Sequence, residues 1–313
     1  MCPRFSSENP HLDMSIETYF RICEAMQYAH TVDFTGWGEP LLSKQIFTMI
    51  RMAKERDCRT TMTSNGTALV EKNCVSLLEA GLDSLVVSVD GMRPETYDPI
   101  RIGASFENVS GKLQTLSCLR HAKQSSMELG VAFTMQENNV SDLELIVPWM
   151  LSVGADNLHL KHVNVVSNQQ DWKSSFLRYV HQPRFPDSQV LGDLEKRISI
   201  LMGEANQAGI QLMMHSEFPL TSRLEGRHCL ATPLNSIYFS YDGKASPCCH
   251  FGHHVSRYFE GRFYPPSSLE FGDINVQSFS EIWESAPFRE FRNGFETTQY
   301  PEACETCYLL YGK

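Results

Sequence analysis

Residues 31–40 read Thr-Val-Asp-Phe-Thr-Gly-Trp-Gly-Glu-Pro, and the interpretation of the whole chain starts from this stretch. Residues 31–37 form a strand candidate, and a Gly-x-Gly turn lies at its end. In parallel α/β folds, ligands bind at the carboxyl ends of strands, where the connecting loops diverge. Gly36 and Gly38 let the backbone approach a ligand closely, and Glu39 adds a carboxylate that can hold an ammonium group. The alternative is an ordinary turn with a solvated glutamate, and this motif alone leaves both interpretations open.

Strand candidates alternate with amphipathic helix candidates through the first two thirds of the chain. Apolar residues recur at helical spacing in five segments, which are residues 15–29, 42–55, 69–80, 142–153 and 192–208. The strand candidates are residues 31–37, 59–64, 84–90, 130–136 and 157–164, with a short extended segment at 210–215. This alternation predicts right-handed βαβ units and therefore a parallel sheet or barrel.

Four residues are expected to mark the ends of these helices. Ser15 and Ser141 have side chains that can cap a helix N-terminus. Gly81 and Gly154 follow apolar periodic runs and can adopt the left-handed conformation that ends a helix. Residues 165–190 are polar and contain two prolines, so we expect an irregular connection there.

The strand candidates place polar side chains on one face. In residues 84–90, Leu85, Val87 and Val89 alternate with more polar positions, so the apolar face should pack on helices. The same alternation turns polar residues inward on the next two strands. The inward set is Ser88, Asp90, Thr134, Gln136, His159 and Lys161. A closed eight-stranded barrel fills its interior with aliphatic side chains, so a polar interior predicts a cavity that holds a ligand.

The sequence pattern changes toward the C-terminus. Residues 235–241 alternate as a strand, Asp242-Gly243 is a hairpin turn signal, and residues 244–248 can return as the partner strand. Residues 280–293 have the spacing of an amphipathic helix. We therefore predict two domains, residues 1–216 and residues 217–313.

The bulk composition excludes several classes of protein. The chain has 27 Lys and Arg against 37 Asp and Glu, a formal net charge of −10. An acidic chain repels phosphate backbones, so nucleic acid is not expected as a partner. No run of about 18 apolar residues predicts a membrane span, and the N-terminus lacks the apolar region of a signal peptide. We expect no membrane association.

Ten cysteines are present, and their distribution favours metal ligands over disulfides. Cys229, Cys248, Cys304 and Cys307 lie in the last 85 residues, and the last two have Cys-x2-Cys spacing. Close spacings in a large chain without a secretion signal predict thiolate ligands in a reducing compartment, here the cytoplasm. A structural zinc site and an iron–sulfur cluster use the same four thiolates, and the spacing leaves both open. Cys249 is expected to be a spare neighbour.

The motifs taken in order resemble the radical S-adenosylmethionine (SAM) superfamily. Met1-Cys2-Pro3-Arg4 resembles the tail of that family's Cys-x3-Cys-x2-Cys loop, and Trp37-Gly38-Glu39-Pro40 resembles its Gly-Gly-Glu-Pro motif. Ser88-Val89-Asp90-Gly91, leading to Tyr97 and Arg101, resembles its fourth-strand segment. The resemblance implies a partial (β/α)6 barrel that here lacks its first strand.

The family's catalytic [4Fe–4S] cluster needs three thiolates, and this chain supplies Cys2 alone. By the family spacing, the other two cysteines and the first strand lie upstream of Met1. We therefore expect an N-terminally truncated chain with an incomplete cluster site and no activity by itself.

The resemblance also implies roles for individual residues. Glu39 would hold the methionine amino group of SAM, Ser88 and Arg101 its carboxylate, and Asn65 or Asp90 would lie near the ribose. The implied cofactor-binding set is Gly36, Gly38, Glu39, Pro40, Asn65, Ser88, Asp90 and Arg101. Gln136, His159 and Lys161 are the candidates for contacts with the substrate.

The C-terminal cysteines resemble the SPASM/twitch extension of the same superfamily. Cys229, Gly243 and Cys248 fit its Cys-x9–15-Gly-x4-Cys spacing, and Cys304 and Cys307 complete four ligands. The resemblance implies one auxiliary [4Fe–4S] cluster bound by these four cysteines.

The implied function is an oxidoreductase or maturase-type enzyme. A 5′-deoxyadenosyl radical made from SAM would abstract a hydrogen atom from a peptide or small-molecule substrate, with flavodoxin or ferredoxin as electron donor. The alternative is a non-catalytic, cluster-less relative with a structural zinc site.

Overall fold

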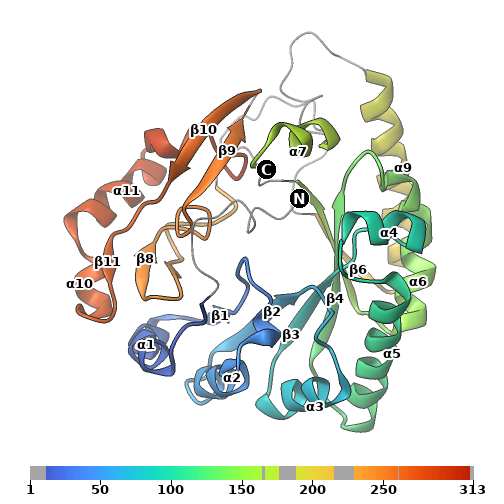
Figure 1. Cartoon of the computed structure of the whole chain (residues 1–313), viewed down its shortest axis with the longest axis horizontal. Coiled ribbons are helices and arrows are strands. Elements are labelled where there is room, and N and C mark those ends of the chain that lie inside the picture. The colour runs from blue at the N-terminus through green and yellow to red at the C-terminus, as the bar shows by residue number, and fades with distance from the viewer. Residues whose placement is uncertain (1–11, 164–165, 176–187, 215–228, 260, 311–313) are drawn as a thin grey trace. The chain divides into compact units, whose positions relative to one another are not determined.

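The computed structural model of the chain describes residues 12–163, 166–175, 188–214, 229–259 and 261–310 (Figure 1). The chain divides into two compact units that are not consecutive in sequence. Unit 1 comprises Met1–Ala29, Asn164–Trp172 and Ser222–Lys313, and unit 2 comprises His30–Val163 and Lys173–Thr221. The boundary predicted between residues 216 and 217 lies outside the described residues and stays a prediction.

Unit 2 is built on one parallel sheet of six strands in sequential order, as predicted. The strands are β1 (Thr31–Asp33), β2 (Arg59–Ser64), β3 (Ser84–Ser88), β4 (Glu128–Met135), β5 (Asn157–His162) and β6 (Gln211–Met214). All five strand pairs are parallel. Because consecutive parallel strands need a crossover on each return, the carboxyl ends of all six strands meet at one edge of the sheet.

Helices connect the strands and line the outside of the sheet in Figure 1. They are α2 (Ile46–Lys54), α3 (Glu71–Ala80), α4 (Pro94–Ile100), α5 (Phe106–Ala122), α6 (Ile146–Val153) and α9 (Ser188–Gln207). Short 3-10 helices, η3 (Pro40–Leu42) and η4 (Val140–Leu145), precede α2 and α6. The short helix α7 (Gln169–Ser174) falls in the stretch expected to be irregular.

The strand faces divide as the alternation predicts. Leu85, Val87, Leu158 and Leu160 are fully buried in a single core cluster with apolar residues of the helices. Val86, which points the other way, is buried but lies outside that cluster. Burying one apolar face against the helices fixes the register of each strand, because a slip by one residue would turn the polar face toward the helices.

The helix ends follow the predictions at three of four positions. Ser15 caps α1 (Ile16–Ile22) by accepting from the Thr18 backbone N–H, and Gly81 and Gly154 are left-handed with φ of 80° and 66°. The prediction for Ser141 is wrong, because this residue lies inside η4. The buried carboxylate of Asp142 binds the Met92 backbone N–H and the Arg93 side chain, and this holds residues 140–145 in a tighter turn.

Unit 1 contains two small antiparallel sheets. One joins β7 (Tyr238–Phe239), β8 (Lys244–Ser246) and β11 (Gly272–Asp273), and the other joins β9 (Val255–Phe259) and β10 (Arg262–Ser267). The predicted hairpin is present, since β7 pairs antiparallel with β8 and Gly243 in the turn has a φ of 88°.

The predicted single helix at 280–293 consists of two helices, α10 (Phe279–Trp283) and α11 (Ala286–Glu296). A proline in the first turn of α11 favours a helix start there and not a helix interior. The two helices pack on each other through the Arg292 guanidinium, which lies 3.9 Å from the centroid of the Trp283 ring. The first helical segment of the chain, α1 followed by the 3-10 helix η2 (Cys23–Tyr28), belongs to this unit.

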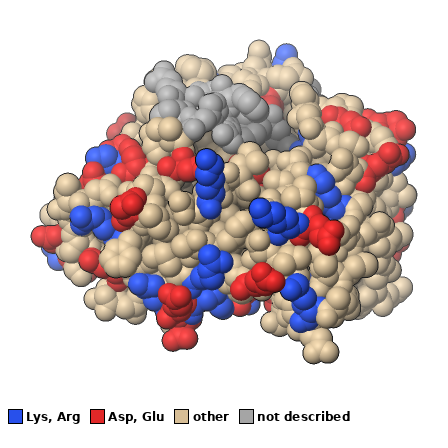
Figure 2. Space-filling model, turned by 60° about the horizontal axis from the view of Figure 1, so that its bottom comes forward, with Lys and Arg blue, Asp and Glu red and all other residues tan. Residues whose placement is uncertain are grey.

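Two surface observations bear on the partner classes considered above. Over the described residues on the face drawn in Figure 2, acidic and basic side chains are interspersed. Among the helices that the structure describes, none is both long and apolar enough to cross a bilayer.

Gly91 provides a test of the packing that positions the carboxyl edge of the sheet. A Cβ atom at Gly91 would lie 2.6 Å from the backbone nitrogen of Tyr97, which cannot move without shifting α4. We expect Gly91→Ala to reduce the free energy of unfolding by about 1–3 kcal/mol, the usual range for overpacking. Gly111→Ala is the control, because this glycine in α5 has no atom within 4 Å of its built Cβ. It should gain roughly 0.5–1 kcal/mol in urea unfolding, and equal effects of the two substitutions would contradict this packing argument.

Candidate functional site

Glu39 ties the loop after β1 to the end of β2. Its Oε1 accepts from the Ser64 hydroxyl at 2.8 Å and from the Leu41 backbone N–H at 3.2 Å, and its Oε2 accepts from the Asn65 backbone N–H at 2.7 Å. Oε1 uses both of its lone pairs in these bonds, but Oε2 keeps one, so the group can still accept from a bound ammonium. The sequence Gly-Glu-Pro produces this geometry because Glu39 is the N-cap of η3 and Pro40 occupies its first turn.

The turn after β2 is shaped by its own side chains. The Asn65 Oδ1 accepts from the backbone N–H of Thr67 at 2.8 Å and from its hydroxyl at 2.6 Å, and Gly66 is left-handed with a φ of 76°. A Cβ atom at Gly66 would lie 2.9 Å from Val87 of β3. The loop therefore stays close to the neighbouring strand.

Asp90 and Arg101 form a buried ion pair at the next strand end. The Asp90 side chain is fully buried, and its Oδ2 accepts from Arg101 Nε at 2.6 Å. Its Oδ1 accepts from the Thr134 backbone N–H at 2.7 Å. Asn139 Nδ2 donates to the Asp90 carbonyl at 3.1 Å. These bonds join the end of β3, the end of α4 and β4 around one carboxylate.

Lys161 of β5 lies within electrostatic range of this pair. Burial lowers the pKa of the Lys161 ammonium, the carboxylates of Asp33 and Asp90 raise it, and Arg101 lowers it. Asp33 ends β1 and accepts from the Thr35 backbone N–H and hydroxyl at 3.0 Å and 2.6 Å. The sequence reasoning missed Asp33, because no local pattern shows that it lies near Lys161. Four charges from four segments of the chain are thus gathered here.

The remaining predicted residues of unit 2 lie on β3 and β5 or in the segments that follow β1 and β4. His159 Nε2 lies 3.0 Å from Asn157 Oδ1 on β5, and Gly130 of β4 makes room for that asparagine. Gln136 is buried and follows β4, and Ser88 ends β3. Gly36 and Gly38 are exposed in the loop before Glu39. Cys2 lies outside the described residues.

The four C-terminal cysteines are gathered in unit 1. Cys304 and Cys307 are buried, and Cys229 and Cys248 are half-buried, with Cys304 in the core of the unit and Cys229 and Cys248 packed against it. The Cys307 backbone N–H donates to the Cys304 carbonyl at 3.1 Å, so the Cys-x2-Cys segment forms a tight turn. Cys229 is joined to the same segment, because the next residue, Leu230, donates to the Leu309 carbonyl at 3.0 Å.

The pKa shifts of these thiols show that they interact. Burial raises the pKa of Cys229 to about 11, and Cys307 contributes to the rise. Burial also raises the pKa of Cys248 and Cys304, with neighbouring cysteines as further causes in both cases. Within the described ranges, no three Cys, His, Asp or Glu side chains stand in a geometry that could hold a single metal ion. The evidence that the four cysteines form one group is therefore their effect on one another's pKa. Because burial destabilises their thiolate forms, a bound metal centre would stabilise them strongly.

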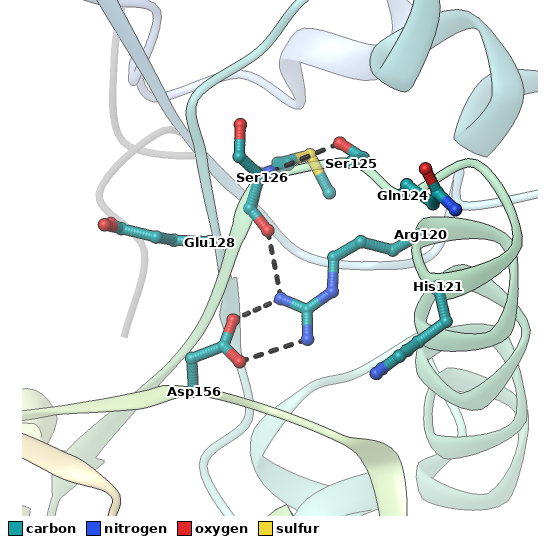
Figure 3. A pocket seen from close by; sticks show the side chains of 8 residues that line it. Arg120, His121, Gln124, Ser125, Ser126, Glu128 and Asp156 are labelled. Carbon is teal, nitrogen blue, oxygen red and sulfur yellow. Dashed lines mark hydrogen bonds and ion pairs between the residues drawn. The ribbon is translucent and has the colours of Figure 1, made fainter.

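A hollow of about 520 Å³ lies at the opposite edge of the sheet in unit 2. Its walls come from the end of α5, the start of β4 and Asp156, which precedes β5 (Figure 3). The Arg120 guanidinium there binds the Asp156 carboxylate and donates to the Met127 and Gly154 carbonyls at 3.0 Å and 3.1 Å. Since Arg120 is occupied by the protein itself, we assign it to the support of the strand starts and not to a ligand.

Comparison with known families places two models on the chain. The model of the radical SAM superfamily matches residues 1–145, and the model of SPASM, an iron–sulfur cluster-binding domain, matches residues 229–308.

Individual relatives match nearly the whole chain at low identity. The tungsten-containing aldehyde ferredoxin oxidoreductase cofactor-modifying protein of Pyrococcus furiosus is 22% identical over 99% of this chain and 83% of its own length. The PqqA peptide cyclase of Granulibacter bethesdensis is 23% identical over 98% of this chain and 75% of its own. The crystal structure of Streptococcus suis SuiB bound to S-adenosylmethionine shares the fold, with a TM-score of 0.65 at 11% identity. This match covers 97% of the present chain and 65% of SuiB.

The Asp90–Arg101 pair gives the stability prediction for this site. Asp90→Asn should lower the free energy of unfolding by about 3 kcal/mol, because it breaks a buried pair and leaves Arg101 without its counter-charge. The estimate is at the lower end of the usual range, since the Arg101 side chain is 23% exposed. Glu79→Gln is the control, because Glu79 pairs with Lys123 at the surface and should cost no more than about 1 kcal/mol. If urea unfolding gave both variants the same small loss of unfolding free energy, the buried pair would not be a major source of stability at this edge of the sheet.

Proposed function

Because the chain belongs to the radical SAM superfamily and carries a SPASM domain, we propose that it binds SAM at the carboxyl ends of the strands of unit 2. There it generates a 5′-deoxyadenosyl radical that abstracts a hydrogen atom from a peptide or small-molecule substrate. SAM and the catalytic [4Fe–4S] cluster supply the radical, and Cys2 is one of the cluster's cysteine ligands. The protein's part is to bind, orient and shield the reacting groups.

The observation that carries the proposal is the set of polar anchors at neighbouring strand ends. Glu39 is held by Ser64 and Asn65, so its carboxylate is in place for the methionine ammonium. Arg101 is held by Asp90 through Nε and Nη2, which leaves Nη1 for the methionine carboxylate beside Ser88. The amide oxygen of Asn65 and the carboxylate oxygens of Asp90 already accept hydrogen bonds within the protein. We therefore assign these two residues to shaping the ribose side of the site.

Gly36, Gly38 and Pro40 would set the approach of the backbone to SAM. Both glycines are exposed, and a Cβ at Gly36 would meet no atom within 4 Å, so this loop leaves room for a ligand. A side chain at these positions would occupy that room.

We assign the substrate contacts to the polar face of β4 and β5. His159, Lys161 and Gln136 lie there, and Lys161 is near Asp33, which joins the candidates. Relatives whose names state a peptide in one case and a cofactor in another support the proposed classes of substrate. Flavodoxin or ferredoxin is the proposed electron donor.

The second part of the proposal concerns Cys229, Cys248, Cys304 and Cys307. Four thiols gathered in a small core fit the donor set of one [4Fe–4S] cluster. In the proposed reaction this auxiliary cluster accepts an electron from the substrate radical or binds the substrate, which gives the enzyme an oxidoreductase or maturase activity.

Glu39→Gln tests the SAM site. In reconstituted protein, the substitution should weaken SAM binding by about 1–3 kcal/mol in calorimetry, the cost of losing a charged hydrogen-bond partner. Ser64→Ala separates charge from geometry, because it removes one bond to Glu39 and leaves its charge. It should have a smaller effect. Glu71→Gln, on the exposed first turn of α3, should leave binding unchanged. Unchanged affinity in Glu39→Gln would exclude Glu39 from the site.

Metal analysis tests the auxiliary cluster. After anaerobic reconstitution, a Cys2→Ala chain should still bind about four irons with matching sulfide, since a closed four-thiolate site suits one [4Fe–4S] centre. Adding Cys304→Ala should remove that iron and make unit 1 more sensitive to proteolysis, because a small domain depends on its metal centre for stability. Adding Cys249→Ala should do neither.

The zinc alternative gives a different result in the same analysis. It predicts roughly one zinc per chain and no iron–sulfur absorption. Stoichiometric zinc with negligible iron in protein purified without oxygen would refute the cluster assignment and the electron-transfer role.

A further inference from the structure

Arg257 in β9 is held beside the Cys-x2-Cys segment of unit 1. Its Nη1 donates to the carbonyl of Ala303 at 2.9 Å, directly before Cys304, and its Nη2 donates to the Ser267 hydroxyl at 3.1 Å. The guanidinium carbon lies 5.0 Å from the centroid of the Phe251 ring. Bonds to both β10 and the cysteine segment fix the position of this cation.

Two features of Arg257 are not explained by this anchoring. Its Nε–H is buried and has no hydrogen-bond partner in the part of the chain that the structure describes. Among the described residues, no carboxylate forms an ion pair with it. A guanidinium remains charged at any pH the protein meets, and a half-buried charge without a counter-ion is costly. A residue that served only to hold the Ala303 carbonyl would not need the charge.

The charge of Arg257 acts on the cysteines themselves. It lowers the pKa of Cys304 and of Cys307 against the larger effect of burial. Arg257 therefore lies within electrostatic range of at least two of the four thiols, and its bond to the Ala303 carbonyl places it directly beside the Cys-x2-Cys segment.

We infer that Arg257 is a positioning residue for the auxiliary cluster, whose charge offsets the negative charge of the four-thiolate centre and raises its reduction potential. This inference rests on the proposed function, since it requires the cluster at Cys229, Cys248, Cys304 and Cys307. Net charge, hydrogen bonds to the sulfurs and solvent exposure set the potential of such a cluster. Arg257 supplies the first of these directly, and its unpartnered Nε–H is available for the second.

The redox step balances without a further co-reactant. The cluster takes up one electron, no bond forms or breaks, and the net charge of the centre becomes more negative by one. A fixed cation stabilises the more negative state more strongly than the less negative one. In the proposed reaction the electron comes from the substrate radical, and in the experiment it comes from dithionite.

The experiment compares two variants of Arg257 in the Cys2→Ala chain, so that only the auxiliary cluster is present. Iron and sulfide are first counted in each reconstituted protein, and the midpoint potential is then determined by a dithionite titration followed by electron paramagnetic resonance. Arg257→Gln should keep its iron and become at least tenfold harder to reduce, which for one electron is a shift of about 59 mV to more negative potential. Arg257→Lys keeps the charge and should shift by much less. Arg262→Gln, exposed on the neighbouring β10, should not shift.

The possible results distinguish a failure of the role of Arg257 from a failure of the cluster assignment. An unaltered chain without iron would refute the cluster assignment. Full iron in Arg257→Gln with an unaltered potential would overturn the role of Arg257. If Arg257→Gln does not retain its cluster, Arg257→Lys decides: a potential close to that of the unaltered chain supports the charge effect, and a shift of tenfold or more overturns it.

Discussion

The buried carboxylate of Asp90 is the interaction on which the carboxyl edge of unit 2 depends. It accepts from the Arg101 guanidinium and from the Thr134 backbone N–H, and Asn139 donates to the backbone carbonyl of the same residue. A charge with no access to water is tolerated only when such partners surround it. The pair therefore fixes where β3, α4 and β4 end relative to one another. Glu39 does the same for the loop after β1 and the end of β2. In the candidate site, two carboxylates thus hold neighbouring strand ends in position.

A different constraint governs unit 1. Its strands have two to six residues, and its main core gathers around a few aromatic side chains, such as the stacked rings of Phe271 and Phe288. Such a unit buries little apolar surface, so it needs another source of stability. Buried thiols with raised pKa values are costly as thiolates until a metal centre compensates them. On the proposed function, folding of the unit and binding of its cluster are thus coupled.

Sequence reasoning was most successful where one physical rule acted alone. The alternation at 84–90 predicted which face packs on the helices, and Gly81 and Gly154 end helices as expected. It was wrong where tertiary contacts override local preference. Ser141 does not cap a helix, because Asp142 is drawn to residues 92 and 93, and β1 ends at Asp33 because Thr35 turns back to bind it. Asp33 was missed for the same reason, since no local pattern shows that β1 and β5 bring it near Lys161. The roles of the predicted cofactor-binding residues remain predictions.

The most direct test of the account is hydrogen–deuterium exchange of the reconstituted protein with and without SAM. The central claim is that SAM binds at the carboxyl edge of the sheet in unit 2. The account predicts slower exchange on SAM addition in residues 36–41, 64–67, 90–92 and 134–136. It predicts no change in residues 120–128 and 154–156, around the hollow that Arg120 lines at the opposite edge. Protection confined to that opposite edge, with the carboxyl edge unaffected, would contradict the claim.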